Sequence, residues 1–171
     1  MKTLRLLMIK ECQRTCPGCC NKDWELDKLP ICNSFKGYEE IIITGGEPMM
    51  DTVKLMGLVY QIRDENPEAK IYVYTSDTRN IERLSYVVYN VDGLTLTLHE
   101  QSDITPFEKF DALLYGAMET DEWPHKSLRL NVFKGIEHLK PWCNWQIKKD
   151  IVWIKDCPLP KNEVFMRTKD L

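Results

Sequence analysis

Four of the seven cysteines lie in one short run, CQRTCPGCC, from Cys12 to Cys20. Thiols this close together serve as a disulfide framework, as a thiol redox pair, or as ligands of a metal site. Disulfides are rare in a reducing cytosol, and an odd number of cysteines cannot pair completely. For a cytosolic chain, the run therefore indicates metal or redox chemistry.

The spacing within the run favours an iron–sulfur cluster. Cys12, Cys16 and Cys19 form a CxxxCxxC pattern, and close thiolates of this kind hold [4Fe–4S] clusters, in which a fourth cysteine normally completes the ligand set. Cys20 directly follows Cys19, and adjacent residues in a tight loop rarely both reach one cluster. Three protein ligands would leave one iron open, and an open coordination position is where a metal centre does chemistry.

Two strands should position this run and a second motif. The apolar stretch 4–9 predicts a strand that ends before Cys12, and residues 40–44 predict a strand that ends at Gly45-Gly46-Glu47-Pro48. The unalternating β-branched run at 41–43 is typical of a buried parallel strand. Ligands in parallel α/β folds lie at the carboxyl ends of the strands, so we expect the two motifs side by side at one rim.

Strand and helix patterns alternate about six times along the chain, which is the signature of βαβ units and a parallel sheet or barrel. The chain should form one α/β domain over residues 1–171. Thr52 is expected to cap the first helix. Further strands are predicted at 71–75, 94–99, 128–133 and 151–154, helices at 52–66, 81–88 and 106–118 (with Phe107, Phe110, Leu113 and Leu114 inward), a helical turn at 136–139, and a Pro-bearing tail at about 156–171.

Two of the predicted strands alternate polar and apolar residues. Period-two alternation gives each strand one apolar and one polar face. If helices cover the outside, the polar faces line the concave interior; the alternative is an edge strand with its polar face in water. The residues concerned are Thr95, Thr97, His99, Arg129 and Asn131.

The cysteine run after the first strand, with Gly-Gly-Glu-Pro after the second, resembles the radical S-adenosylmethionine (SAM) enzymes. The resemblance extends over the whole chain, because the strand–helix alternation is similar to the family's partial (β/α)6 barrel with mostly parallel strands. It implies that Cys12, Cys16 and Cys19 ligate three irons of a [4Fe–4S] cluster whose fourth iron chelates SAM. The chain departs from many members at Gly18, where they have an aromatic residue.

The resemblance also implies a set of SAM-binding residues. Gly45, Gly46 and Glu47 would lie along the methionyl amino group, where glycine lets the backbone approach without a Cβ, and Pro48 would turn the chain away. Residues 151–153 of the last strand would lie near the adenine. For the ribose and the carboxylate the candidates are Thr97, His99, Arg129 and Asn131, with Arg129 the natural partner of the carboxylate.

The activity implied is reductive cleavage of SAM to methionine and a 5′-deoxyadenosyl radical, which abstracts hydrogen from a substrate under anaerobic conditions. The compact size and Gly18 slightly favour an activase of a glycyl-radical protein, such as an anaerobic ribonucleotide reductase. The alternative is an enzyme on a small molecule, similar to 7-carboxy-7-deazaguanine synthase. A peptide substrate is disfavoured. A flavodoxin or ferredoxin is the expected electron donor.

Two alternative interpretations of the cysteine run account for fewer of the residues in the two motifs. Cys16-Pro17-Gly18-Cys19 is a CxxC of the thioredoxin-like kind, but it leaves Cys12 and the glycine motif unused. A structural zinc site could use Cys16, Cys19, Cys32 and one further ligand. Cys20 is expected either to support the cluster ligands from behind or to be a small buried hydrophobe. The dispersed cysteines Cys32, Cys143 and Cys157 are expected to be buried in the core or inert, as free cysteine commonly is.

Composition excludes two classes of partner. A net charge of −3 and a pI near 5.7, with the basic residues scattered, give no footprint for nucleic acid. No run approaches the roughly 18 apolar residues of a membrane helix, and the first residues lack a secretory signal, so we expect a cytoplasmic protein. The histidines His125 and His138 and the pairs Asp121-Glu122 and Lys148-Lys149 are expected at the surface.

Overall fold

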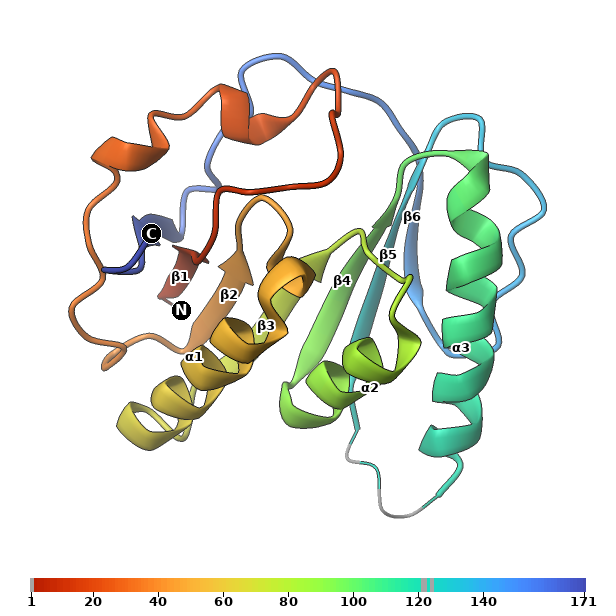
Figure 1. Ribbon diagram of the computed structural model, residues 1–171, viewed down its shortest axis with the longest axis horizontal. Coiled ribbons are helices and arrows are strands. Elements are labelled where there is room, and N and C mark those ends of the chain that lie inside the picture. The colour runs from red at the N-terminus through yellow and green to blue at the C-terminus, as the bar shows by residue number, and fades with distance from the viewer. Residues whose placement is uncertain (1, 121–122, 124) are drawn as a thin grey trace. The chain divides into compact units, whose positions relative to one another are not determined.

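A computed structural model describes residues 2–120, 123 and 125–171. The chain divides into two compact units, Met1–Val73 with Trp153–Leu171, and Tyr74–Val152. Figure 1 traces the alternation of strands and helices through both. The expected acidic pair Asp121-Glu122 lies outside the described residues.

The first unit is built on parallel strands in the order β3-β2-β1-β7. Helix α1 (Thr52–Glu65) lies along the side of these strands that faces the viewer in Figure 1. The strands are β1 (Thr3–Leu7), β2 (Glu40–Thr44), β3 (Lys70–Thr75) and β7 (Glu163–Arg167), and the short 3-10 helices are η1 (Cys20–Lys22), η2 (Leu26–Lys28) and η3 (Pro48–Asp51).

The core of this unit follows from the apolar runs. Leu4, Leu6, Ile41 and Ile43 are fully buried on β1 and β2, as expected of strands with both faces covered. Helix α1 adds the fully buried residues Leu55 and Ile62, which lie on one helical face.

The residue that caps helix α1 is Asp51, one position before the predicted cap. The side chain of Asp51, not that of Thr52, accepts a hydrogen bond from the backbone N–H of Lys54 at 2.9 Å, and Thr52 is the first helical residue. An aspartate accepts such a bond as well as threonine does, and its charge suits a helix N-terminus. The helix ends at Glu65, two residues before Pro67.

The second unit holds parallel strands in the order β4-β5-β6 with helices α2 and α3. The leucines of β4 are buried, and Phe107, Phe110 and Leu114 of α3 are fully buried as predicted. The bounds are α2 (Ile81–Asn90), β4 (Gly93–Leu98), η4 (Gln101–Asp103), α3 (Ile104–Met118), β5 (Ser127–Phe133) and β6 (Gln146–Ile151).

One inward position of α3 was predicted wrongly. Leu113 is 45% exposed, and Asp111 is fully buried instead. The carboxylate of Asp111 accepts hydrogen bonds from the backbone N–H groups of Trp142 and Cys143 and from the indole N–H of Trp145. A buried carboxylate with several donors is stable in the core, so helical periodicity alone misjudged this face.

Three features after β5 also differ from the prediction. Residues 136–139 form no helical turn, and β6 ends at Ile151, where the predicted strand began. Residues 146–150 of β6 are all exposed, so this strand carries no apolar pattern to mark it. The predicted tail contains β7, which pairs in parallel with β1.

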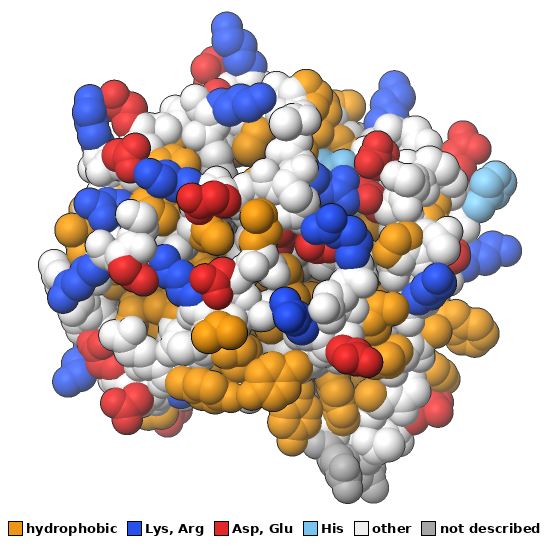
Figure 2. Space-filling model, viewed as in Figure 1, with side chains coloured by type: hydrophobic (Ala, Val, Ile, Leu, Met, Phe, Trp, Pro, Cys, Tyr) orange, Lys and Arg blue, Asp and Glu red, His pale blue; other side chains and the backbone are white. Residues whose placement is uncertain are grey.

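The predicted α/β class with mostly parallel strands is confirmed. The described residues contain seven strands, and the pairings within each unit are parallel. None of the helices in this part of the chain is long and apolar enough to cross a membrane. On the face seen in Figure 2, acidic, basic and hydrophobic side chains are interspersed.

Candidate functional site

The cysteine run and the glycine motif lie against each other in the first unit. Strands β1 and β2 are parallel neighbours, so the chain leaves both at the same edge. Beyond the strands, the N–H of Gly46 donates to the carbonyl of Ile9 at 2.7 Å, and the N–H of Glu47 donates to the carbonyl of Glu11 at 2.8 Å. The two motifs are therefore side by side at one rim, as the sequence predicted.

The glycines are required by this contact between the loops. A Cβ on Gly46 would lie 2.0 Å from the carbonyl oxygen of Glu11, and one on Gly45 would lie 2.4 Å from that of Ile9. Both colliding atoms are backbone, which cannot swing away as the end of a side chain can. The absence of a Cβ thus lets the segment that leads to Cys12 lie directly on the glycine motif, whatever ligand binds beyond it.

Further hydrogen bonds fix the cysteine loop, which we define as residues 12–23. The side-chain amide of Asn21 donates to the carbonyl of Gly45 at 2.7 Å, which ties the far end of the loop to the glycine motif. Lys22 donates from Nζ to the carbonyl of Cys16 at 2.9 Å. The N–H of Arg14 donates to Sγ of Cys12 at 3.4 Å. The loop therefore has a defined path although it lacks regular strand structure.

The three thiols of this loop lie close enough to influence one another. Burial raises the pKa of the Cys12 thiol, and the negative charges of Glu47 and Cys19 raise it further, while the N–H of Arg14 opposes them. Burial also raises the pKa of the Cys16 thiol, with Cys19 and Cys12 adding to the rise. Gathering thiolates here is unfavourable unless a cationic group joins them, and iron is such a group.

The donor set fits an iron–sulfur cluster better than a single metal ion. Cys12, Cys16 and Cys19 are free thiols on one loop, with Cys12 exposed and the other two half-buried. Within the described residues, no three Cys, His, Asp or Glu side chains converge closely enough to hold one ion. A cluster does not demand such convergence, because each thiolate ligates a different iron of the cube.

The end of the glycine motif is organised by its own side chains. Glu47 is only 1% exposed, and its Oε1 accepts a hydrogen bond from the N–H of Met49 at 3.1 Å. Pro48 is buried and begins η3, a position where its missing N–H costs nothing. The predicted contact of Glu47 with a methionyl amino group stays a prediction, and the structure gives the carboxylate a capping role.

The remaining predicted residues lie together in the second unit. Strand register pairs Thr95 with Arg129 and Thr97 with Asn131. The amide of Asn131 donates to Oγ1 of Thr97 at 3.4 Å. His99 follows the end of β4, with its ring centroid 4.9 Å from that of Phe133. These side chains form a polar row on neighbouring strands, and their predicted contacts with SAM stay predictions.

Sequence reasoning missed a polar turn at the end of β3. The N–H of Asp77 donates to Oγ1 of Thr75 at 3.0 Å, and the guanidinium of Arg79 binds both carboxylate oxygens of Asp77 at 2.9 and 2.7 Å. The available signal was the Thr-Ser-Asp sequence that begins at the last residue of the predicted strand 71–75, since the carboxyl end of a parallel strand is where ligands bind.

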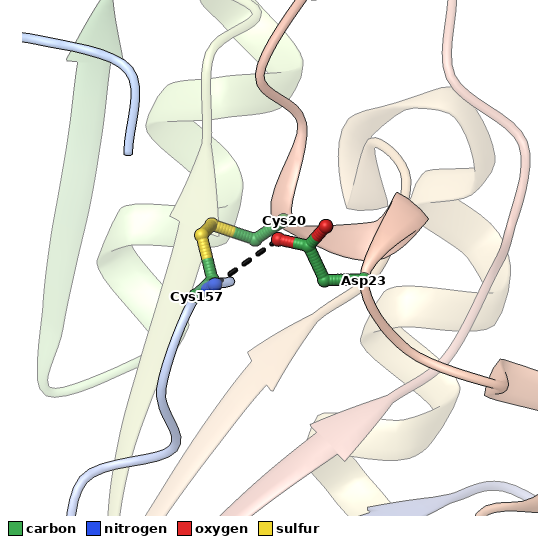
Figure 3. The surroundings of a disulfide bond; sticks show 3 residues. All are labelled: Cys20, Asp23 and Cys157. Atoms are coloured by element: carbon green, nitrogen blue, oxygen red, sulfur yellow. Dashed lines mark hydrogen bonds between the residues drawn. A yellow bond between two sulfur atoms is a disulfide. The ribbon is translucent and has the colours of Figure 1, made fainter. Parts of the chain in front are cut away.

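Cys157 is buried as expected, but neither it nor the exposed Cys20 is a free thiol, because the two form a disulfide. Figure 3 shows the bond, with Asp23 accepting a hydrogen bond from the N–H of Cys157 at 3.0 Å. The partners are 137 residues apart, so no spacing pattern could reveal them. The general rarity of cytosolic disulfides misdirected the prediction. Cys32 is buried as expected.

Trp153 also differs from its predicted place on the last strand. It follows β6 and packs on Gly18, where an added Cβ would lie 2.6 Å from the Cβ of Trp153. The position before Cys19 thus has no side chain of its own and is covered by an indole from a distant part of the sequence. The structure therefore places an aromatic ring beside the residue that precedes Cys19.

The two rival interpretations lack support in the described residues. Cys16 and Cys19 are free thiols, and the first helical turn of the loop starts at Cys20 rather than at Cys16, where a thioredoxin-like redox helix would begin. The proposed zinc ligands do not converge on one point.

Comparison with protein families gives one match. Residues 3–94, just over half of the chain, match the family model described as a 4Fe-4S single cluster domain. The matched range holds the cysteine loop, the glycine motif and strands β1 to β3. No curated protein matches the chain significantly.

Proposed function

Because the chain belongs to the family of 4Fe-4S single cluster domains, and is therefore an iron–sulfur protein, we propose that it is a radical SAM enzyme. Cys12, Cys16 and Cys19 would hold the cluster, and the iron without a cysteine ligand would take the amino and carboxylate groups of SAM. When bound and reduced, the cluster supplies the electron that cleaves SAM to methionine and a hydrogen-abstracting 5′-deoxyadenosyl radical.

One observation carries this proposal, namely the contact between the cysteine loop and the glycine motif. A cluster used only for electron transfer needs four ligands and a protected position. This chain instead offers three free thiols on a loop that Asn21 ties to the glycine motif. Gly46 and Glu47 hold the backbone segment that leads into this loop. The pairing of three ligands with an adjacent backbone surface suits a cluster that binds a small molecule at its open iron.

The chain's own residues would orient the cofactor. Asn21 ties the two loops together, so the position of the thiols relative to the glycine motif is fixed before any ligand binds. In the second unit, the row of Thr97, His99, Arg129 and Asn131 offers hydroxyl, imidazole, guanidinium and amide groups. These are suited to a ribose and a carboxylate, with Arg129 able to pair with the carboxylate.

For the substrate, we favour a glycyl-radical protein, which would make the chain an activase. Its support is the compact cluster domain with Gly18 before the third cysteine. A small-molecule substrate is the second candidate, favoured by the polar row on β4 and β5, because polar groups on neighbouring strands suit a small polar ligand. In either case a flavodoxin or ferredoxin would supply the electron.

The test is anaerobic reconstitution with iron and sulfide, followed by SAM and dithionite and detection of 5′-deoxyadenosine by mass spectrometry. Cys12→Ala, Cys16→Ala and Cys19→Ala should each abolish the product, since each removes one iron ligand. Cys32→Ala is the matched control, because Cys32 is a buried free thiol outside the loop. A cluster-loaded wild type that yields no product, with and without either substrate class, would overturn the proposal.

A further inference from the structure

The segment that follows β6 returns to the cysteine loop and is fastened there at three points. We define residues 153–157 as the strap. Its first residue, Trp153, packs on Gly18. Its last residue, Cys157, forms the disulfide with Cys20 and donates its N–H to Asp23. Strap and loop belong to the same compact unit, and Figure 3 shows the fastening at its covalent end.

The backbone of the strap is shaped for this contact. Asp156 has φ 56, in the left-handed region that L-residues seldom adopt and that Asp and Asn tolerate better than most. This bend immediately precedes Cys157, which is almost completely buried, whereas residues 154–156 are exposed. The strap therefore contacts the loop at both of its ends, and its middle residues are exposed to solvent.

The residues that the strap contacts lie on either side of one proposed cluster ligand, Cys19. Gly18 precedes Cys19, and Cys20 follows it, so the strap holds the residue on either side of this thiol. Trp153 is 38% exposed, so most of its surface is covered. The two contacts therefore restrain the backbone on both sides of Cys19.

We propose that the Cys20–Cys157 disulfide is a redox-controlled clasp that governs how tightly the strap holds the cluster loop. The inference rests on Cys19 being a cluster ligand and is independent of SAM cleavage. In the oxidised state the strap stays closed and the loop retains iron. A dithiol reductant opens it, which frees the loop for cluster loading and exchange.

The redox step balances with a dithiol of the thioredoxin class. One thiolate of the reductant attacks Sγ of Cys20, the exposed partner, and the S–S bond breaks with Cys157 as the leaving thiolate, which takes up a proton. The second thiol of the reductant then attacks the mixed disulfide and releases Cys20 as a thiol. The protein gains two electrons and two protons, and the reductant becomes a disulfide.

The experiment measures iron release from the cluster-loaded protein to a ferrous-iron chelator under anaerobic conditions. One sample carries the intact disulfide, and the other has been treated with dithiothreitol. We expect release to be roughly tenfold faster after reduction, because a covalently tethered strap rebinds far more often than a free one. Maleimide labelling with mass spectrometry confirms the redox state of Cys20 and Cys157 in each sample.

Matched variants distinguish the effect of opening the disulfide from other effects of dithiothreitol on iron release. Cys157→Ser should release iron at the fast rate with and without dithiothreitol, which also shows how much the reagent itself strips iron. Cys32→Ser keeps the disulfide and should behave as wild type. Trp153→Ala should accelerate release with the disulfide intact, while Trp153→Phe, which keeps a ring on Gly18, should do so less.

Two outcomes would overturn the proposal, and a third separates it from the proposed function. If Cys20 and Cys157 are labelled without prior reduction in protein purified under air, the clasp does not form. If the disulfide forms and iron leaves equally fast before and after its reduction, the clasp does not govern the cluster. A protein that loads iron and shows the clasp, yet makes no 5′-deoxyadenosine, would contradict the proposed function and leave this inference standing.

Discussion

At the scale of single residues, Gly46 is a position where an added methyl group would collide with backbone. Its Cβ would lie 2.0 Å from the carbonyl oxygen of Glu11, so the backbone of one loop would have to move. We expect Gly46→Ala to lower the free energy of unfolding by about 1–3 kcal/mol, the usual cost of overpacking, and to reduce cluster loading. Urea unfolding and the iron content after reconstitution measure the two effects.

Gly57 supplies the control for this substitution. It lies in the exposed part of α1, and an added Cβ there meets nothing within 4 Å. Gly57→Ala should raise stability by about 0.5–1 kcal/mol, because alanine favours a helix over glycine. Similar unfolding curves for the two variants would show that the contact between the loops does not need glycine.

A second residue-scale prediction concerns the reactivity of Cys143. Burial, together with the hydrogen bond and charge of Asp111, raises the pKa of its thiol from 9.0 to about 12. At pH 8 the folded protein should therefore hold about a thousandfold less Cys143 thiolate than the unfolded chain does. Alkylation by iodoacetamide, followed by peptide mass spectrometry, should leave Cys143 unmodified until the protein is denatured.

The raised pKa of Cys143 also makes the stability of the protein depend on pH. Because the folded state keeps the proton on Cys143 and the unfolded state loses it from about pH 9, stability should fall as pH rises through the alkaline range. Rapid alkylation of Cys143 in the native protein at pH 8 would contradict the raised pKa.

At the scale of elements, Asp111 joins α3 to the segment between β5 and β6. Its fully buried carboxylate accepts hydrogen bonds from two backbone N–H groups and the indole of Trp145. Asp111→Ala would leave these buried donors without acceptors, which should cost about 3 kcal/mol or more of unfolding free energy. Chemical denaturation followed by tryptophan fluorescence measures the change.

Glu108 is the matched control on the same helix. It is an exposed carboxylate one turn before Asp111, so Glu108→Ala should change stability by less than about 0.5 kcal/mol. Asp111→Asn keeps one carbonyl acceptor and should fall between the two. If Asp111→Ala is no more destabilising than Glu108→Ala, the carboxylate does not hold the segment.

Elements with a strong local pattern could be predicted from the sequence, and elements defined by their partners could not. Strand β2 was bounded correctly because three consecutive isoleucines leave few alternatives. Strand β6 is exposed along its length and exists through its pairing with β5, so the apolar residues after it drew the prediction too far. Strand β7 was missed because its partner, β1, lies at the other end of the chain.

The candidate site likewise combines features that the sequence predicts with features that it does not. The cysteine spacing and the glycine motif were visible as local patterns, and their expected position after neighbouring strands was correct. The disulfide and the contact of Trp153 with Gly18 join residues more than a hundred positions apart, and nothing in their local sequence indicates a partner. Long-range contacts of single residues are set by the final packing.

At the scale of the whole molecule, the disulfide restrains the unfolded chain. Its 137-residue separation makes a large closed loop, for which chain-entropy arguments give about 5 kcal/mol of stabilisation. We expect dithiothreitol to lower the denaturant midpoint of the wild type and to leave that of Cys157→Ser unchanged. Cys32→Ser should respond as the wild type does, and equal midpoints of oxidised and reduced wild type would contradict the prediction.

The same bond changes what proteolysis can do to the protein. Unit Tyr74–Val152 lies entirely between Cys20 and Cys157 in the sequence, so the covalent ring closed by the disulfide encloses all of it. A protease that cuts once anywhere within the ring opens it without separating any fragment. Such a cut would leave the oxidised protein at full mass apart from one added water, and the two pieces would separate only after reduction.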